Sequence, residues 1–343
     1  MSGQEASSQE APPAHGGRLA ELRHLFPHAP APFLDLSTGI NPYPYKVPPL
    51  APSCADDALT RLPEPEARAA LEAAAARAYG LADPGLVLAC AGSQALIGLL
   101  PLLRPRSLVA VLAPTYAEHA FAWRAAGHHV QEVATLADAA AADVVVLCNP
   151  NNPDGRTIAA ADLRAFAAPL AARGGWLVVD EAFADFAPAG VSLAPSFPAH
   201  GVIVLRSFGK ASGLAGLRLG FALVPAGLAP RLRAALGPWP VSGAAIAIGT
   251  LVLEDDAWRA AMAARLAEDA ARLDAVLEAA GLTKRGGTPL FRLAESTDAA
   301  SVFEQLGAAG ILVRRFAAHP RWLRFGLPGA AFDRLAAALA LRA

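Results

Sequence analysis

Residues 207–220 read SFGKASGLAGLRLG, a run of small and apolar residues that contains two cations, Lys210 and Arg218. Lysine is seldom buried, whereas Gly, Ala and Leu are typical of close-packed backbone. A lysine in such surroundings can act as a nucleophile toward an aldehyde, because burial favours its neutral form. Lys210 is therefore our first candidate for a catalytic residue, and a solvated lysine in a glycine-rich loop is the alternative.

Five apolar runs, with helical patterns between them, lead up to this stretch. Their order is typical of βα units on a mostly parallel sheet, and ligands of such folds bind where the strands end. Polar or turn-forming residues follow each run, so we expect one edge of the sheet to carry the chemistry. The runs are Leu86–Cys90, Leu108–Leu112, Val144–Leu147, Trp176–Val179 and Val202–Leu205.

The pattern changes at the sequence GPWP, residues 237–240, to long helices over 245–280, a mixed segment and a helix from Phe332. This change favours a second, smaller α+β domain. The predicted organisation, in three parts, is an N-terminal arm (1–34) that starts as a mobile tail before His15, a large α/β domain (35–236) and a small C-terminal domain (237–343).

Composition restricts the function. With 54% hydrophobic and 17% charged residues, the 343-residue chain can bury a large core. A formal net charge of -1 favours neither nucleic acid nor an anionic membrane, and we find no signal peptide or membrane span. Cys54, Cys90 and Cys148 are too few and scattered for a disulfide framework or a closed metal site. We expect a cytoplasmic protein with a small-molecule partner and no metal.

Asp180 ends the apolar strand WLVVD, residues 176–180, so its carboxylate is expected at the same edge of the sheet as Lys210. A lysine for the aldehyde and an acid for the ring nitrogen form the pair that pyridoxal phosphate uses in many enzymes. A carboxylate that caps the following helix is the alternative for Asp180 alone.

Other residues at this edge suit the remaining parts of such a cofactor. Gly92-Ser93-Gln94 begins a helix after a strand and offers backbone N–H groups to a phosphate, to which Ser207 and Arg218 add a hydroxyl and a charge. Tyr116 can stack on a ring, or pack in the core. Asn152 can donate to a ring hydroxyl, although Asn-Pro turns explain its segment equally well.

Three motifs in this order resemble the fold-type I pyridoxal phosphate enzymes of the aspartate-aminotransferase-like superfamily. They are NPNNPDG (149–155), VVDEAF (178–183) and SFGKASGLAGLRLG (207–220). The resemblance covers roughly residues 35–330. It implies the fold-type I transferase architecture, with a large, mostly parallel sheet flanked by helices and a smaller C-terminal α+β domain.

Within this superfamily the chain is similar to histidinol-phosphate aminotransferases and, more closely, to threonine-phosphate decarboxylases of cobalamin biosynthesis. HGG (15–17) and LDLSTGINPYPY (34–45) resemble segments of the decarboxylases. The resemblance implies a homodimer that decarboxylates a phosphorylated amino acid, L-threonine O-3-phosphate, to (R)-1-aminopropan-2-yl phosphate. An aminotransferase is the alternative, since the same residues serve both reactions. A regulatory module fused to a DNA-binding domain is disfavoured, because about 35 residues precede the fold and none forms a helix-turn-helix pattern.

Roles carried over by matching motif are as follows. Lys210 forms the Schiff base, Asp180 partners the pyridine nitrogen, Asn152 donates to the ring oxygen and Tyr116 stacks on the ring. Arg324, in WLRFGLPG, receives the substrate α-carboxylate. The residues matched to the cofactor phosphate are Gly92, Ser93, Gln94, Ser207 and Arg218, and those placed near the substrate are His15, Asn41, Asn152 and Arg314.

The chain also departs from the family pattern at four positions. Gly209 replaces a serine or threonine, Phe183 a tyrosine, and Leu62 a tyrosine that in many relatives reaches the partner subunit's cofactor phosphate. Asp154 replaces the threonine of NPTG. With three hydroxyls missing, we predict weaker cofactor retention than in a typical aminotransferase, which dialysis against cofactor-free buffer would measure.

Overall fold

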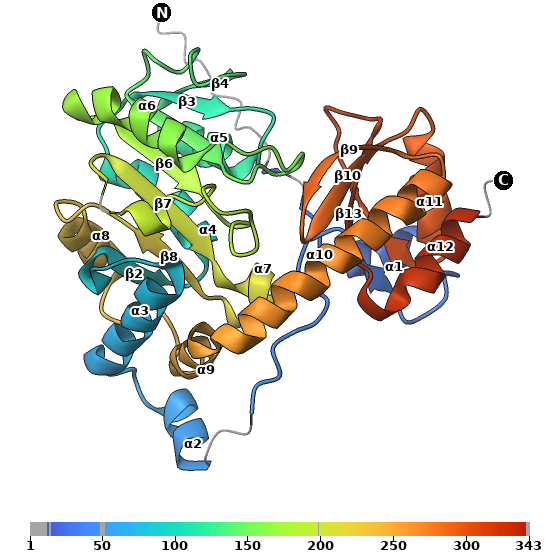
Figure 1. Cartoon of the computed structure of the whole chain (residues 1–343), viewed down its shortest axis with the longest axis horizontal. Coiled ribbons are helices and arrows are strands. Elements are labelled where there is room, and N and C mark those ends of the chain that lie inside the picture. The colour runs from blue at the N-terminus through green and yellow to red at the C-terminus, as the bar shows by residue number, and fades with distance from the viewer. Residues whose placement is uncertain (1–11, 14, 49–51, 198, 341–343) are drawn as a thin grey trace, which may run out of the picture.

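The computed structural model describes residues 12–13, 15–48, 52–197 and 199–340, and the predicted tail before His15 lies almost wholly outside them. Figure 1 shows a large sheet between helices, a smaller sheet with its own helices, and the long helix α10 (Asp256–Ala279) running from one to the other. In the part of the chain so described, no helix is long and apolar enough to cross a membrane.

The large sheet has seven strands in the order β2-β8-β7-β6-β5-β3-β4. Only β8 runs antiparallel to its neighbours, β2 and β7. All five apolar runs predicted as strands lie in this sheet, whereas the exposed edge strand β4 and the reversed strand β8 were not predicted. The strands are β2 (Val87–Cys90), β3 (Leu108–Leu112), β4 (His129–Val133), β5 (Val144–Cys148), β6 (Trp176–Asp180), β7 (Val202–Ser207) and β8 (Gly220–Leu223).

Helices cover both faces of this sheet, which explains why its central strands are apolar along their whole length. Val145 packs in one buried cluster, with Leu71 and Leu163 of the helices α3 and α6. Its neighbour Val144 packs on the other face, with Trp123 of α5. The flanking helices are α3 (Pro65–Tyr79), α4 (Ser93–Leu99), α5 (Glu118–Ala125), α6 (Ala160–Ala172) and α8 (Ala229–Leu236).

The helical stretch predicted over 245–280 is two helices, α9 (Gly243–Glu254) and α10. They meet at Asp255, whose carboxylate accepts a 2.8 Å hydrogen bond from the Trp258 N–H and so begins the second helix. A third buried cluster joins α10 to an antiparallel sheet and to two helices. These elements are β9 (Thr283–Thr288), β10 (Phe291–Glu295), β12 (Arg314–Arg315), β13 (Trp322–Gly326), α11 (Ala299–Ala308) and α12 (Phe332–Ala340).

The beginning of the chain lies beside its C-terminal part. β1 (Leu34–Asp35) pairs in parallel with β11 (Ile311–Leu312), and Leu36 packs in the C-terminal core cluster. The architecture is that of the predicted α/β class, while the two boundaries between the three predicted parts stay predictions. The remaining elements are α1 (Leu19–Leu25), α2 (Pro52–Thr60), α7 (Phe208–Ser212) and the 3₁₀ turns η1 (Pro84–Leu86), η2 (Leu100–Leu103), η3 (Ala194–Ser196), η4 (Ala215–Leu217) and η5 (Gly329–Ala331).

Candidate active site

A cavity of about 260 Å³ lies where β2, β3, β5, β6 and β7 end. Loops after these strands, the N-terminal arm and β13 line it, so residues from distant parts of the sequence meet there. Eleven predicted site residues line this cavity: His15, Gly92, Ser93, Gln94, Tyr116, Asn152, Asp180, Ser207, Lys210, Arg218 and Arg324.

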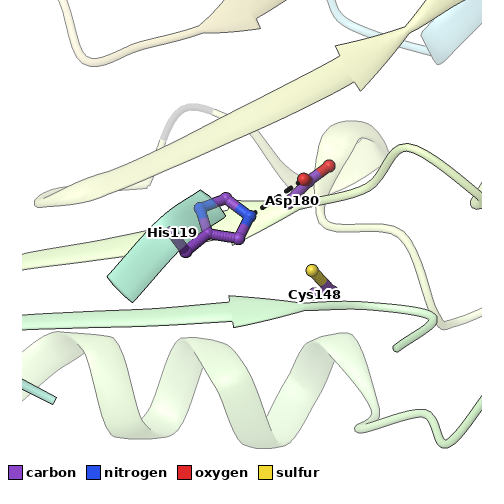
Figure 2. A group of neighbouring side chains, drawn as sticks. All are labelled: His119, Cys148 and Asp180. Atoms are coloured by element: carbon purple, nitrogen blue, oxygen red, sulfur yellow. Dashed lines mark hydrogen bonds and ion pairs between the residues drawn. The ribbon is translucent and has the colours of Figure 1, made fainter. Parts of the chain in front are cut away.

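Asp180 is held by His119, a residue of α5 (Figure 2). The His119 Nε2 donates to Asp180 Oδ2 at 3.0 Å, and the Ala182 N–H donates to the other oxygen at 3.0 Å. Burial alone would raise the pKa of Asp180, but the hydrogen bond and charge of His119, with the charge of Lys210, lower it. The carboxylate is therefore kept ionised although it is buried.

Lys210 lies on the short helix α7, directly after β7. Its Nζ is 3.4 Å from Ser207 Oγ and 4.9 Å from the centre of the Phe183 ring. Burial lowers the pKa of Lys210, and the charges of Arg324 and Arg218 lower it further, against the opposing effect of Asp180. This environment favours the neutral amine that can attack a carbonyl.

Asn41, predicted to contact the substrate, instead supports the lysine loop. Its backbone N–H donates to the Lys210 carbonyl at 2.9 Å, and its Nδ2 donates to the Ala211 carbonyl at 2.8 Å. Asn41 is buried and does not line the cavity, and neither does Arg314. The geometry favours a positioning role for Asn41, because its amide is already used within the protein.

Arg218 lies against the glycine turn that begins α4. A Cβ at Gly92 would come within 2.8 Å of Arg218 Nη2, and Gly92 has a φ of +83°, so no larger residue fits there. Arg218 itself has a φ of 55°, uncommon for a residue with a side chain. The turn and the guanidinium together make a cationic wall that suits a phosphate.

Arg324, on β13, also lines the cavity. It is only 6% exposed, its Nη2 donates to the Ser37 carbonyl at 2.7 Å, and its Nη1 donates to Asn152 Oδ1. Its Nε is buried and has no hydrogen-bond partner among the residues that the structure describes. Burial, together with the charge of Arg314, lowers the pKa of Arg324 to about 10. A carboxylate bound here would satisfy both the charge and the free donor.

Three side chains that line the cavity, His15, Gln94 and Tyr116, form a hydrogen-bonded group with Glu118, and we call this group the mouth of the cavity. The His15 Nε2 donates to Glu118 Oε1 at 2.8 Å, and the Gln94 Nε2 donates to Glu118 Oε2 at 2.8 Å. The Tyr116 hydroxyl in turn donates to Gln94 Oε1 at 3.1 Å. Glu118 therefore ties the N-terminal arm to the helices α4 and α5.

The departures from the family pattern have physical reasons in this structure. A Cβ at Gly209 would lie 2.6 Å from the Ala215 Cα, so the turn η4 leaves no room for serine. Phe183 packs edge-on against Phe291 at 4.9 Å, an apolar contact that needs no hydroxyl. Asp154 accepts from Asn151 Nδ2 at 2.7 Å and from the Arg156 N–H at 3.1 Å, which shapes its turn. Leu62 is 63% exposed.

His119, Cys148 and Glu118 are functional candidates that sequence reasoning missed. Cys148 ends β5 directly beside Asp180 in the strand register, and all three ligand atoms of His119, Cys148 and Asp180 lie within 4.8 Å of one another (Figure 2). His119 follows Tyr116 by only three residues, and this closeness in sequence is the signal that could have placed it near the same site.

The donor set suits a phosphorylated pyridine aldehyde such as pyridoxal phosphate. A buried amine, an ionised acid, an aromatic ring and a cation against a glycine turn all line one cavity. The orphaned Nε of Arg324 adds a separate position for a carboxylate. The fold, the cavity and these residues define a cofactor-dependent enzyme that acts on amino acids.

The chain belongs to the aminotransferase class I and II family, whose model matches residues 31–339. It is 44% identical over 330 residues to the threonine-phosphate decarboxylase of Pseudomonas aeruginosa, which covers 95% of this chain and 96% of that protein. It is 45% identical over 336 residues to the threonine-phosphate decarboxylase of Sinorhizobium sp, with 96% and 98% covered.

The fold matches the solved structure of histidinol-phosphate aminotransferase from Sinorhizobium meliloti in complex with pyridoxal-5'-phosphate. The TM-score is 0.77 at 23% identity, and the match covers 95% of this chain and 98% of that one. The fold-type I architecture expected from the motifs is confirmed.

Proposed function

We propose that this chain decarboxylates L-threonine O-3-phosphate to (R)-1-aminopropan-2-yl phosphate, with pyridoxal phosphate as cofactor, as a step of cobalamin biosynthesis. One observation carries the proposal: relatives named for this activity match at 44–45% identity over nearly the whole chain. The site geometry supports the proposal in two ways. Lys210 and Asp180, with the side chains packed against them, form what we call the floor of the cavity, and they suit the cofactor. The buried Arg324 has an Nε without a hydrogen-bond partner among the described residues.

Residues at or near the ends of several strands of the large sheet would hold the cofactor. Lys210 would take the aldehyde, Asp180 the ring nitrogen and Arg218 with the Gly92 turn the phosphate, while Tyr116 stacks on the ring. When bound, pyridoxal phosphate supplies an electron sink for the pair released at the substrate α-carbon. Asp180 keeps its negative charge through His119, so it can hold a proton on the ring nitrogen.

Arg324 and Asn152 would orient the substrate carboxylate. Arg324 Nη1 already donates to Asn152 Oδ1, and Nη2 donates to the Ser37 carbonyl, so the guanidinium plane is held before substrate arrives. This orientation selects the bond to be broken, since only a bond perpendicular to the cofactor ring overlaps its electrons. The carboxylate leaves as CO₂ and a proton replaces it on the α-carbon, for which the Lys210 amine is placed to move protons.

The phosphate of the substrate would bind at the mouth, where the arm residue His15 is held by Glu118. Of the residues predicted near the substrate, His15 and Asn152 line this cavity, whereas Arg314 lines a neighbouring cavity that shares His15 and Ser37. Asn41 acts on the lysine loop instead. His15 is therefore the residue of the arm that we propose for substrate recognition.

An aminotransferase would use the same residues and differ only in which bond is set perpendicular to the ring. Purified protein with pyridoxal phosphate is incubated with O-phospho-threonine and assayed for CO₂, and separately with histidinol phosphate and 2-oxoglutarate and assayed for glutamate. We expect CO₂ from the first mixture and no glutamate from the second, with Lys210→Ala inactive in both. Glutamate without CO₂ would overturn the decarboxylase and favour the aminotransferase.

We also infer that the chain works as a homodimer in the cytoplasm. The exposed Leu59 and Leu62, at and just after the end of α2, are large apolar side chains for which a second copy would provide cover. Light scattering after size-exclusion chromatography measures the mass directly. A mass of about 70 kDa, twice the 35.2 kDa chain, is expected, and a monomer at micromolar concentration would contradict the proposal.

A further inference from the structure

The floor of the active-site cavity contains three side chains that can bind a metal ion: His119, Cys148 and Asp180 (Figure 2). All three are buried, and their ligand atoms lie within 4.8 Å of one another. We propose that, in the cofactor-free chain, this cluster binds a soft divalent cation, Zn²⁺ foremost, and that the ion and pyridoxal phosphate exclude one another.

The chemistry of the ligands selects the ion. An imidazole nitrogen, a thiolate sulfur and a carboxylate oxygen are the ligands that Zn²⁺ takes in proteins, whereas Mg²⁺ and Ca²⁺ require oxygens. The carboxylate and the thiolate together balance the double charge of the ion, which lowers the free-energy cost of burying it. On binding, the Cys148 thiol and the His119 Nε2 each release a proton to solvent.

The scaffold holds the three ligands on rigid elements. Cys148 and Asp180 are the last residues of the neighbouring parallel strands β5 and β6, and they are direct partners in the strand register. His119 comes from the first turn of α5, with its Nε2 already 3.0 Å from Asp180 Oδ2. Tetrahedral zinc bonds of about 2.0–2.3 Å place ligand atoms about 3.5 Å apart. Side-chain rotations that move the ligand atoms by about 1 Å would therefore bring all three within bonding distance of one ion.

The fourth ligand position opens toward the cavity. Cys148 and Asp180 both line the cavity, whereas His119 lies behind them and is only 1% exposed. An ion can therefore enter from the cavity and keep one water on that side, as open zinc sites do. The proposed site therefore has three protein ligands and one water, and it differs from the closed four-ligand site that the small number of cysteines argues against.

Competition with the cofactor follows from the shared carboxylate, and this part of the inference rests on the proposed function. Asp180 is the residue that we assign to the ring nitrogen, and one buried carboxylate cannot serve a metal ion and that nitrogen together. His119 would also have to turn its Nε2 from Asp180 to the ion. Zinc would thus block loading of the empty enzyme without acting on substrate.

Cobalt is the probe, because Co²⁺ replaces Zn²⁺ and a thiolate ligand gives it a charge-transfer band in the near ultraviolet. The full-length chain, stripped of cofactor, is titrated with Co²⁺, then with Zn²⁺, then with pyridoxal phosphate. We expect the band to appear with Co²⁺, to vanish on addition of Zn²⁺, and not to form in the chain loaded with pyridoxal phosphate.

Cys148→Ser is expected to abolish the band and to weaken Co²⁺ binding about 100-fold or more, since loss of outer-sphere partners alone costs 10–100-fold. Cys90→Ser is the matched control, because Cys90 is also buried at a strand end but its Sγ donates to the Gly92 carbonyl, and it should keep the band. His119→Gln is a second variant that removes the imidazole and keeps the thiol, and it should weaken binding to a similar degree.

The outcomes separate the two proposals. Absence of the band in the wild-type chain, its persistence in Cys148→Ser, or Co²⁺ and pyridoxal phosphate bound together would overturn the metal site. A chain that binds Co²⁺ through Cys148 but, when free of metal, shows no absorbance change with pyridoxal phosphate would support the metal site and overturn the proposed function.

Discussion

Two histidine–carboxylate pairs each contribute one residue to the lining of the active-site cavity: Asp180, which pairs with His119 at the floor, and His15, which pairs with Glu118 at the mouth. On the floor, His119 and Asp180 meet at 3.0 Å with side chains 1% and 5% exposed. At the mouth, His15 and Glu118 meet at 2.8 Å with side chains 44% and 12% exposed. The two contacts are nearly equal in length, but water reaches only the second.

This difference in burial separates two tasks. A buried pair shifts pKa values and fixes one geometry, because no solvent screens it and its removal leaves a charge without a partner. An exposed pair contributes at most about 1 kcal/mol and can open and close at little cost. The floor is thus suited to holding a reactive group and the mouth to admitting a substrate, so changes on the floor should have far larger effects.

The largest effect is expected from Asp180→Asn, which removes the charge of the floor. The amide cannot hold a proton on the cofactor ring, so kcat with saturating pyridoxal phosphate should fall about 10²–10³-fold, the usual cost of losing one preorganised electrostatic group. Steady-state CO₂ release measures it. Asp185→Asn, at another acid of the same loop that pairs instead with Arg206 at 2.9 Å, is the control. Equal losses in both variants would argue for a general structural defect.

Arg324→Lys should have the next largest effect. Lysine keeps the charge but cannot donate to Asn152, to the Ser37 carbonyl and to a carboxylate in one plane. We expect kcat/KM for O-phospho-threonine to fall about 10–100-fold, in line with the loss of one or two charged hydrogen bonds. Arg321→Lys, just before β13 and 58% exposed at its side chain, should leave kcat/KM unchanged. A wild-type value for Arg324→Lys would remove this residue from the substrate site.

Gly209→Ser tests the packing of the floor rather than its charge. The new Cβ would lie 2.6 Å from the Ala215 Cα, so we expect a loss of about 1–3 kcal/mol in the free energy of unfolding, not tighter cofactor binding. Gly216→Ser is the matched control, because Gly216 lies in the turn η4 beside Ala215 and no atom of the described residues lies within 4 Å of its added Cβ. Urea denaturation compares the two. Higher stability and slower cofactor loss in Gly209→Ser would show that the hydroxyl of the relatives can be restored.

The smallest effect is expected from Glu118→Gln at the mouth. It removes the charge that holds His15 but keeps a side chain that can bond to Gln94, so KM should rise about two- to fivefold while kcat stays constant. Glu132→Gln, which breaks an exposed ion pair with Arg124 outside the cavity, should change neither constant. A fall in kcat as large as that expected for Asp180→Asn would show that the exposed pair at the mouth matters as much for the reaction as the buried pair on the floor.

The residues of the floor were easier to predict from the sequence than the residues that contact the substrate. Lys210 and Asp180 follow buried strands, and strand ends can be read from apolar runs, so their meeting at one edge was predictable. Asn41 and Arg314 were placed near the substrate by resemblance alone. The structure shows Asn41 bonded to the Ala211 carbonyl and Arg314 at the neighbouring cavity. For these two residues, the geometry does not support the predicted role.

Only weak signals in the sequence point to the hydrogen-bond partners of these residues. His119 looks like any histidine on a helix until α5 packs against the sheet and turns it toward Asp180. Glu118 looks like a solvated charge until the arm brings His15 to it across 103 residues. Such contacts depend on how elements pack, and packing is decided by many weak interactions that a linear pattern does not contain.

By itself, the sequence determined the parallel sheet, the edge that carries the chemistry, the lysine and acid of the floor, and the family. Period-two and apolar patterns report local burial, and motifs report chemistry, so both can be read along one dimension. Only the tertiary structure decided which groups share a hydrogen bond: His119 with Asp180, Arg324 with Asn152, and Glu118 with His15. The reason is that the reactivity of a buried group is set by its neighbours in space.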